Sequence, residues 1–169
     1  MLKALENQLK SLASQDEEIF LKALQDHLGH KPNEEQVKAV KEFIFLLPPT
    51  LKQLSRYLNE PSVPSEVKKI SGNIITYIYD PEDYLPEGEC GFLGYLDDAY
   101  LVVSAYLKLQ DVYLKDWRDR SPEDLELLKR VRDLYHIPKI VIPDITAKID
   151  ILLESWLKGE TAYPEGKNE

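Results

Sequence analysis

Cysteine and positive charge are scarce in this sequence. Cys90 is the one cysteine among 169 residues, so no disulfide can form within the chain, which suits a reducing compartment. The 21 lysine and arginine residues are outnumbered by 30 aspartate and glutamate residues, which gives a formal net charge of −9. Because phosphate backbones bind to basic surfaces, this balance excludes duplex nucleic acid from the expected partners.

Long apolar runs are lacking as well. The densest apolar stretches cover residues 43–49 and 99–107, far short of the roughly 20 residues that span a bilayer. An early acid, Glu6, and the lack of an apolar run near the start argue against a secretory signal. We therefore expect a cytoplasmic protein without a transmembrane segment, and peripheral contact with a membrane stays open.

Helical periodicity dominates what is present. Leu2, Leu5, Leu9 and Leu12 are spaced three, four and three residues apart, so they share one helix face, which could also form a coiled-coil seam with a second copy. The same spacing predicts helices over residues 2–12, 16–28, 33–47, 51–58, 65–79, 95–115, 121–135 and 144–158. The pattern indicates an all-α, single-domain helical bundle of about seven to eight helices over residues 1–158, with a flexible polar tail at 159–169.

Local signals mark several helix ends. Asn33 and Gln36 have the spacing of a capping box. The run 121–124, Ser-Pro-Glu-Asp, combines a cap residue, a proline at the first helical position and acids that suit the helix dipole. Pro48 and Pro49 are predicted to end the third helix, because neither can donate a backbone hydrogen bond.

The interior of the chain has a central helix and two breaks. Residues 99–107 carry no charge on any face, which is typical of a helix at the centre of its domain. Residues 80–94 are predicted to form an acidic loop rich in proline and glycine. Residues 137–143 are predicted to form an apolar connector, in which Pro138 and Pro143 interrupt the helix. The β-branched residues at 73–79 leave a strand open as an alternative to helix there.

Seven carboxylates within residues 80–98 lie beside the most apolar helix, where a carboxylate costs free energy unless it is bonded or paired. The interpretation we favour is structural: Asp97 or Asp98 caps the following helix, and Asp80 and Asp83 cap turns. A second is a Mg²⁺ or Ca²⁺ ion held by all four of these residues. A third is acid–base catalysis by a carboxylate pair.

Other polar and aromatic residues have less specific surroundings. Cys90 has Glu87 and Glu89 nearby, which disfavours a thiolate, so no nucleophile is assigned to it. Trp117 lies in a run of mixed charge and is a candidate exposed anchor for a partner. Core packing is the favoured role over a recognition surface for the tyrosines near the acidic loop, which are Tyr77, Tyr79, Tyr84, Tyr95, Tyr100, Tyr106 and Tyr113.

The acidic loop also resembles a known motif. The run 80–87, Asp-Pro-Glu-Asp-Tyr-Leu-Pro-Glu, followed by 94–98, Gly-Tyr-Leu-Asp-Asp, is similar to the signature of the YkvA-like family of small bacterial domains of unknown function. The matching positions are Pro81, Asp83, Leu85, Pro86, Gly94, Asp97 and Asp98, while Asp80 replaces the usual Ser and Glu87 the second Asp. The resemblance covers about residues 66–105 and implies helices on both sides of the loop, with no established reaction.

Taken together, these features predict a non-enzymatic helical interaction or adaptor module. No cofactor motif is present, and helix capping explains the acids. The expected partner is another protein or a second copy of the chain. The alternative is a divalent-metal-binding protein, including a metal-dependent hydrolase, that uses Asp83, Asp97 and Asp98 with Asp80 as a further ligand.

Overall fold

A computed structural model describes residues 1–15, 17–79 and 84–159 of the chain. Within these residues it contains ten α-helices and one 3₁₀-helix, with no strand. They are α1 (Leu2–Gln15), α2 (Glu17–Leu28), α3 (Glu34–Ile44), α4 (Leu47–Asn59), α5 (Ser65–Ile78), α6 (Glu87–Cys90), η1 (Gly91–Tyr95), α7 (Leu96–Val112), α8 (Pro122–Leu134), α9 (Ile137–Val141) and α10 (Pro143–Leu157). The all-α prediction is confirmed, and residues 73–78 are helical.

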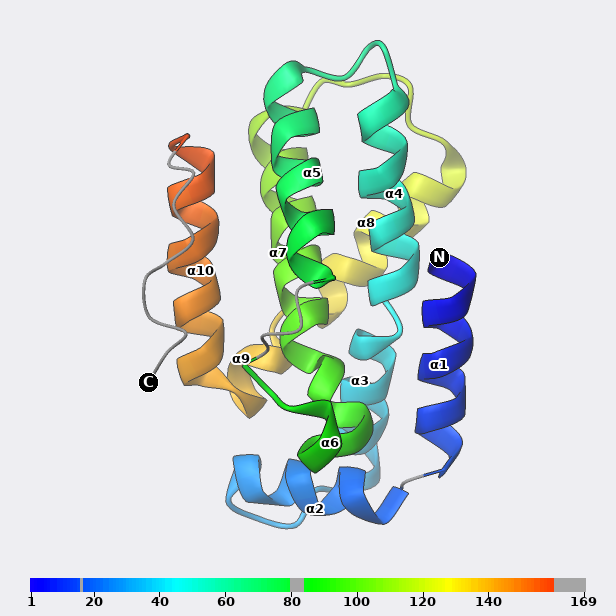
Figure 1. Cartoon of the computed structure of the whole chain (residues 1–169), viewed down its shortest axis with the longest axis vertical. Coiled ribbons are helices and arrows are strands. Elements are labelled where there is room, and N and C mark those ends of the chain that lie inside the picture. Colours follow the sequence, from blue (N-terminus) through cyan, green and yellow to red (C-terminus); the bar gives the residue numbers. More distant parts are fainter. Residues whose placement is uncertain (16, 80–83, 160–169) are drawn as a thin grey trace.

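The helices are arranged around α7. Helices α4, α5 and α7 stand side by side, α1 lies along α4, and α10 stands on the other side of α7 (Figure 1). Helix α2 crosses one end of this bundle, where it packs against α6, η1 and α9. Because α7 contacts α3, α4, α5, α8, α9, α10 and η1, it has neighbours on all sides.

The burial of α7 follows from its composition. Every residue from 99 to 107 is buried, as their lack of charge predicts. The leucine stripe of α1 packs within the same chain, with Leu9 fully buried against the bundle. Among the described residues, none of the helices combines the length and the apolar character of a membrane span.

Several predicted boundaries were wrong. Helix α3 ends at Ile44, and Pro48 and Pro49 lie in the first turn of α4, where the N–H groups have no partner within the helix and proline is tolerated. The predicted loop 80–94 contains α6 and η1, and the predicted connector 137–143 contains α9. The three short helices α6, η1 and α9 all pack against α2, so tertiary contacts support segments too short to be stable alone.

The predicted caps and tail have different outcomes. Asn33 forms the predicted capping box with Gln36, and Ser121 is the predicted cap of α8, where Asp124 completes a capping box that was not predicted. Helix α10 ends at Leu157, and Gly159 follows with φ of 80°. The predicted tail beyond Gly159 lies outside the described residues.

Shortening a buried side chain of α7 is expected to lower the free energy of unfolding. Leu109→Ala removes methyl groups from a side chain that is 0% exposed, and we expect a loss of about 2–5 kcal/mol in the free energy of unfolding. Val112→Ala, on the same helix at 62% exposure, is the control and should change it by less than about 0.5 kcal/mol. Urea denaturation measures both. Equal losses would show that α7 is not closely packed.

Candidate functional site

A buried carboxylate joins the start of α7 to the segment that precedes α6. Asp97 is the second residue of α7 and is 2% exposed. Its Oδ2 accepts hydrogen bonds from the backbone N–H groups of Tyr84, at 3.1 Å, and Leu85, at 3.2 Å. Such charge-assisted bonds offset the cost of removing a carboxylate from water. Asp97 therefore holds the acidic segment against the central helix.

This geometry differs from the predicted helix cap. The cap position of α7 is Tyr95, so Asp97 and Asp98 both lie inside the first turn, where their charge suits the helix dipole. The N–H groups bonded by Asp97 belong to residues twelve and thirteen positions earlier in the chain. Asp97 thus has an architectural role, but it bonds the segment before α6 instead of capping the helix that follows.

The four predicted metal ligands are brought together in part. Asp97 is buried and Asp98 half-buried on one turn of α7. Asp80 and Asp83 lie outside the described residues, so their positions relative to this turn are not described. Among the residues that the structure does describe, no group of three or more His, Cys, Asp or Glu side chains is placed to hold a metal ion.

Three titratable groups near this turn, the phenols of Tyr77 and Tyr84 and the thiol of Cys90, have a raised pKa and are neutral at pH 7. Burial raises the pKa of Tyr77, and Tyr84, Asp97 and Asp98 raise it further. Burial also raises the pKa of Tyr84. The pKa of the Cys90 thiol is raised by burial first and then by Glu89 and Asp97. These directions favour neutral hydrogen-bonding groups and a thiol of low nucleophilicity, as the sequence predicted for Cys90.

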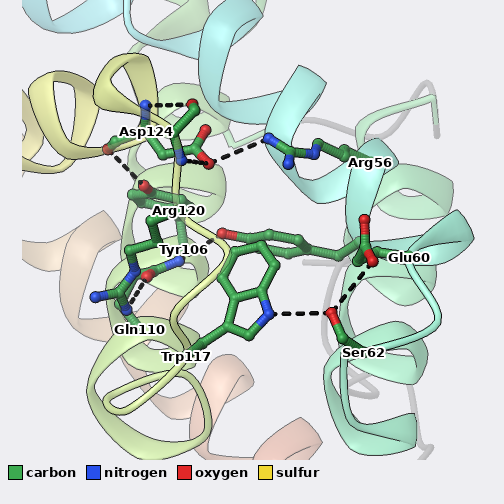
Figure 2. A network of polar contacts seen from close by, with 10 residues as sticks. Arg56, Glu60, Ser62, Tyr106, Gln110, Trp117, Arg120 and Asp124 are labelled. Atoms are coloured by element: carbon green, nitrogen blue, oxygen red, sulfur yellow. Dashed lines mark hydrogen bonds and ion pairs between the residues drawn. The ribbon is translucent and has the colours of Figure 1, made fainter.

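A second polar cluster ties α4 to α8. Arg56 Nη1 donates to Asp124 Oδ2 at 3.1 Å, and the Asp124 carboxylate is 2% exposed (Figure 2). The same Oδ2 accepts from the N–H of Ser121, while the N–H of Asp124 donates to Ser121 Oγ. Asp124 is therefore a capping-box residue and an inter-helix ion-pair partner at once, and the Tyr106 hydroxyl donates to its carbonyl oxygen.

The cluster continues through Gln110 at the end of α7. Gln110 Nε2 donates to the Tyr57 hydroxyl at 2.6 Å, and Arg120 Nη2 donates to Gln110 Oε1 at 2.6 Å. Arg120 also donates to the carbonyl oxygen of Leu114, which fixes the turn after α7. Burial raises the pKa of Tyr57 to about 12. Gln110 thus connects α4, α7 and the segment before α8.

Trp117 is held within the fold. Its ring lies perpendicular to that of Tyr57, with centroids 5.7 Å apart. Its Nε1–H donates to Ser62 Oγ, and the Ser62 hydroxyl donates to Glu60 Oε1, each at 3.1 Å (Figure 2). Trp117 is therefore half-buried and packed against the bundle instead of exposed, and its role as an anchor for a partner stays a prediction.

A third cluster lies midway along α7. The Tyr100 hydroxyl donates to Asp150 Oδ1 at 2.8 Å and lies 3.2 Å from the Tyr135 hydroxyl. The two rings stack with centroids 5.6 Å apart, and Lys139 Nζ lies 4.6 Å from the Tyr135 ring centroid.

The tyrosines near the acidic loop differ in burial. Packing accounts for the four that are buried, Tyr77, Tyr95, Tyr100 and Tyr106. Tyr84 and Tyr113 are half-buried, and Tyr79 is exposed.

Sequence reasoning missed most of these polar clusters. Arg56 and Asp124 lie 68 residues apart, and no spacing rule relates them. One usable signal was Gln110, a polar residue beside the most apolar helical run. A buried amide needs hydrogen-bonding partners, so its position points to a polar cluster.

Surface grooves lie on both sides of α2. The larger, of about 540 Å³, runs between α2 and α3 and is lined by Glu17, Leu21, Pro32, Asn33, Glu34, Val37, Lys38, Lys41, Glu42 and Phe45. The smaller, of about 350 Å³, lies between α2 and α6 and is lined by Ile19, Lys22, Ala23, Asp26, His27, Glu89 and Cys90. Both volumes are in the range of ligand-binding pockets.

Comparison of the chain with protein-family models, curated proteins and solved structures found no match in any of the three. The resemblance of residues 66–105 to the YkvA-like family stays a prediction.

Loss of the Arg56–Asp124 pair is expected to destabilise the bundle. Arg56→Met leaves the buried Asp124 carboxylate without its cation, and we expect a loss of about 1–3 kcal/mol in the free energy of unfolding. Arg132→Met removes the exposed pair with Asp111 and should cost less than about 1 kcal/mol. Chemical denaturation measures both. Equal costs would mean that burial of Asp124 does not strengthen its pair.

Alkaline pH is expected to unfold the protein between about pH 10 and pH 12, because burial raises the pKa of Tyr57 from 10.0 to about 12. Burial shifts the pKa of Tyr100 and Tyr106 in the same direction. A phenol with a higher pKa in the folded state contributes its full stabilisation below the unfolded pKa. It loses this contribution as pH rises through the folded pKa. Tyrosinate absorbance should therefore rise as helical circular dichroism falls. Complete tyrosinate formation in a fully helical chain would contradict this.

Proposed function

We propose that this chain is a non-enzymatic helical interaction module, and that its acidic segment serves the architecture of the bundle. The observation that carries the proposal is the pair of backbone N–H groups, from Tyr84 and Leu85, that bond Asp97 Oδ2. A carboxylate committed to N–H donors of its own chain has a structural use that accounts for its burial.

Other buried polar side chains support the same interpretation. Asp124 and Gln110 connect helices, as described above. Thr50 donates to the carbonyl oxygen of Leu46 at 2.7 Å, and Thr146 donates to that of Pro143 at 2.9 Å. Each of these groups stabilises a helix end or a contact between helices. The burial of these four side chains is therefore explained by the fold.

The proposal includes the location and the type of partner. The single cysteine favours the cytoplasm, and the net charge of −9 favours a protein partner over nucleic acid. The partner is a different protein or a second copy. Light scattering of the purified chain over a range of concentrations distinguishes them. Self-association raises the measured mass, whereas a chain that binds a different protein keeps the mass of one chain. Similarity of residues 66–105 to the YkvA-like family is part of the proposal.

Asp97→Asn tests the structural role of the acidic segment. We expect a loss of about 1.5–3 kcal/mol in the free energy of unfolding, because the bonds from Tyr84 and Leu85 lose their charged acceptor. Asp144→Asn is the matched control: Asp144 is the exposed second residue of α10, and its loss should cost about 0.3–1 kcal/mol. Thermal melts with chelator and with millimolar Mg²⁺ or Ca²⁺ should coincide for the unchanged protein.

The opposite outcome favours the metal-binding alternative. A melting temperature that rises with Mg²⁺ or Ca²⁺, and no longer rises in Asp97→Asn, would show an ion bound by the folded state at this turn. The structural proposal would then be wrong.

A further inference from the structure

The groove between α2 and α3 has an apolar floor. Four half-buried residues line it: Leu21 from α2, Pro32 from the connection, Val37 from α3, and Phe45, which directly follows α3. Phe45 rests on the fully buried Phe92, with ring centroids 5.3 Å apart, so the floor is continuous with the core. Such a floor suits apolar side chains from a partner.

The two lysines that line the groove already have acidic partners. Lys41 Nζ lies 2.5 Å from Glu17 Oε2 and 5.1 Å from the centroid of the Phe20 ring. Lys38 Nζ lies 3.8 Å from Glu42 Oε1. Their charges are therefore compensated within the groove, and neither is placed to attract an anion.

Glu34 is the third carboxylate that lines the groove, beside Glu17 and Glu42, which pair with the two lysines. It is exposed in the first turn of α3 and lines the groove, and within the described part of the chain it forms no ion pair. With three carboxylates and two lysines, the groove carries a net charge of −1, on a chain whose formal net charge is −9. A second copy would bring the same negative charge, so a cationic partner fits this surface better.

We propose that this groove binds a short basic amphipathic segment of a partner protein, with apolar side chains on Val37 and Phe45 and a lysine or arginine beside Glu34. This inference rests on the proposed interaction function and specifies its partner class. The apolar floor supplies most of the contact, and the ion pair at Glu34 selects the sign of charge.

Three peptides of equal length probe the groove of the full chain. The first is a helical peptide with leucine on one face and lysine on the other, the second has glutamate in place of lysine, and the third has the first one's residues in scrambled order. Fluorescence anisotropy of each labelled peptide measures its affinity. We expect the ordered lysine peptide to bind, with an affinity that falls as salt is added, and the other two to bind at least about tenfold more weakly.

Glu34→Lys locates the interaction, and Glu35→Lys is its matched control. Both residues are exposed in the first turn of α3, and both substitutions change the net charge and the helix-dipole contact equally, but Glu35 does not line the groove. We expect Glu34→Lys to weaken binding of the lysine peptide about fivefold and Glu35→Lys less than about twofold. Circular dichroism of each variant checks its fold.

Other outcomes overturn the inference. Equal effects of Glu34→Lys and Glu35→Lys would mean that binding follows overall charge and that Glu34 makes no local contact. Tighter binding of the glutamate peptide would mean that the partner is acidic. If none of the peptides bound, the groove would not be a docking site for such a segment. The measured mass of the protein could instead double as its concentration rises. If the resulting dimer no longer bound the lysine peptide, the groove would be assigned to a second copy. The proposed function is judged separately, by the response of Asp97→Asn to metal ions.

Discussion

The arrangement of this protein depends on one helix, α7, whose central residues 99–107 have no solvent-facing side. Residues 99–107 of α7 are apolar all round, so the helix is stable in water when other helices cover it completely. Seven neighbouring elements do so, and α2 is left to cross one end of the bundle. The polar residues at the two ends of α7, Asp97 and Gln110, are then buried with it and must find partners inside the chain.

Those partners determine how the surrounding helices are held. At one end, Asp97 binds the segment before α6 through two backbone N–H groups. At the other, Gln110 reaches Tyr57 of α4 and Arg120 before α8. Apolar contact is not directional, whereas these bonds demand specific geometry, so they select one packing among those that bury α7 equally well. These contacts are the reason that we propose an architectural role for Asp97 and Asp124.

The proposed interaction surface lies outside the core. Asp97, Gln110 and Asp124 are engaged within the fold, so our proposal places partner contact at the grooves beside α2. Helix α2 buries only Phe20 and Leu24 among its own residues, and its exposed flank leaves the floor of the larger groove open. In our proposal, the negative charge of the chain attracts a cationic segment from a distance, and the apolar floor of the groove then holds it.

The sequence by itself determined the longer helices, the central place of α7, and where α3 and α8 begin, because periodicity and capping act over a few residues. It also located the acidic turn at Asp97. It missed the short helices α6, η1 and α9. Tertiary structure alone decided that Asp97 bonds Tyr84 and Leu85, that Arg56 meets Asp124, and that α2 and α3 leave a groove between them. Contacts between residues far apart in the chain depend on how whole helices pack, and local spacing does not encode that.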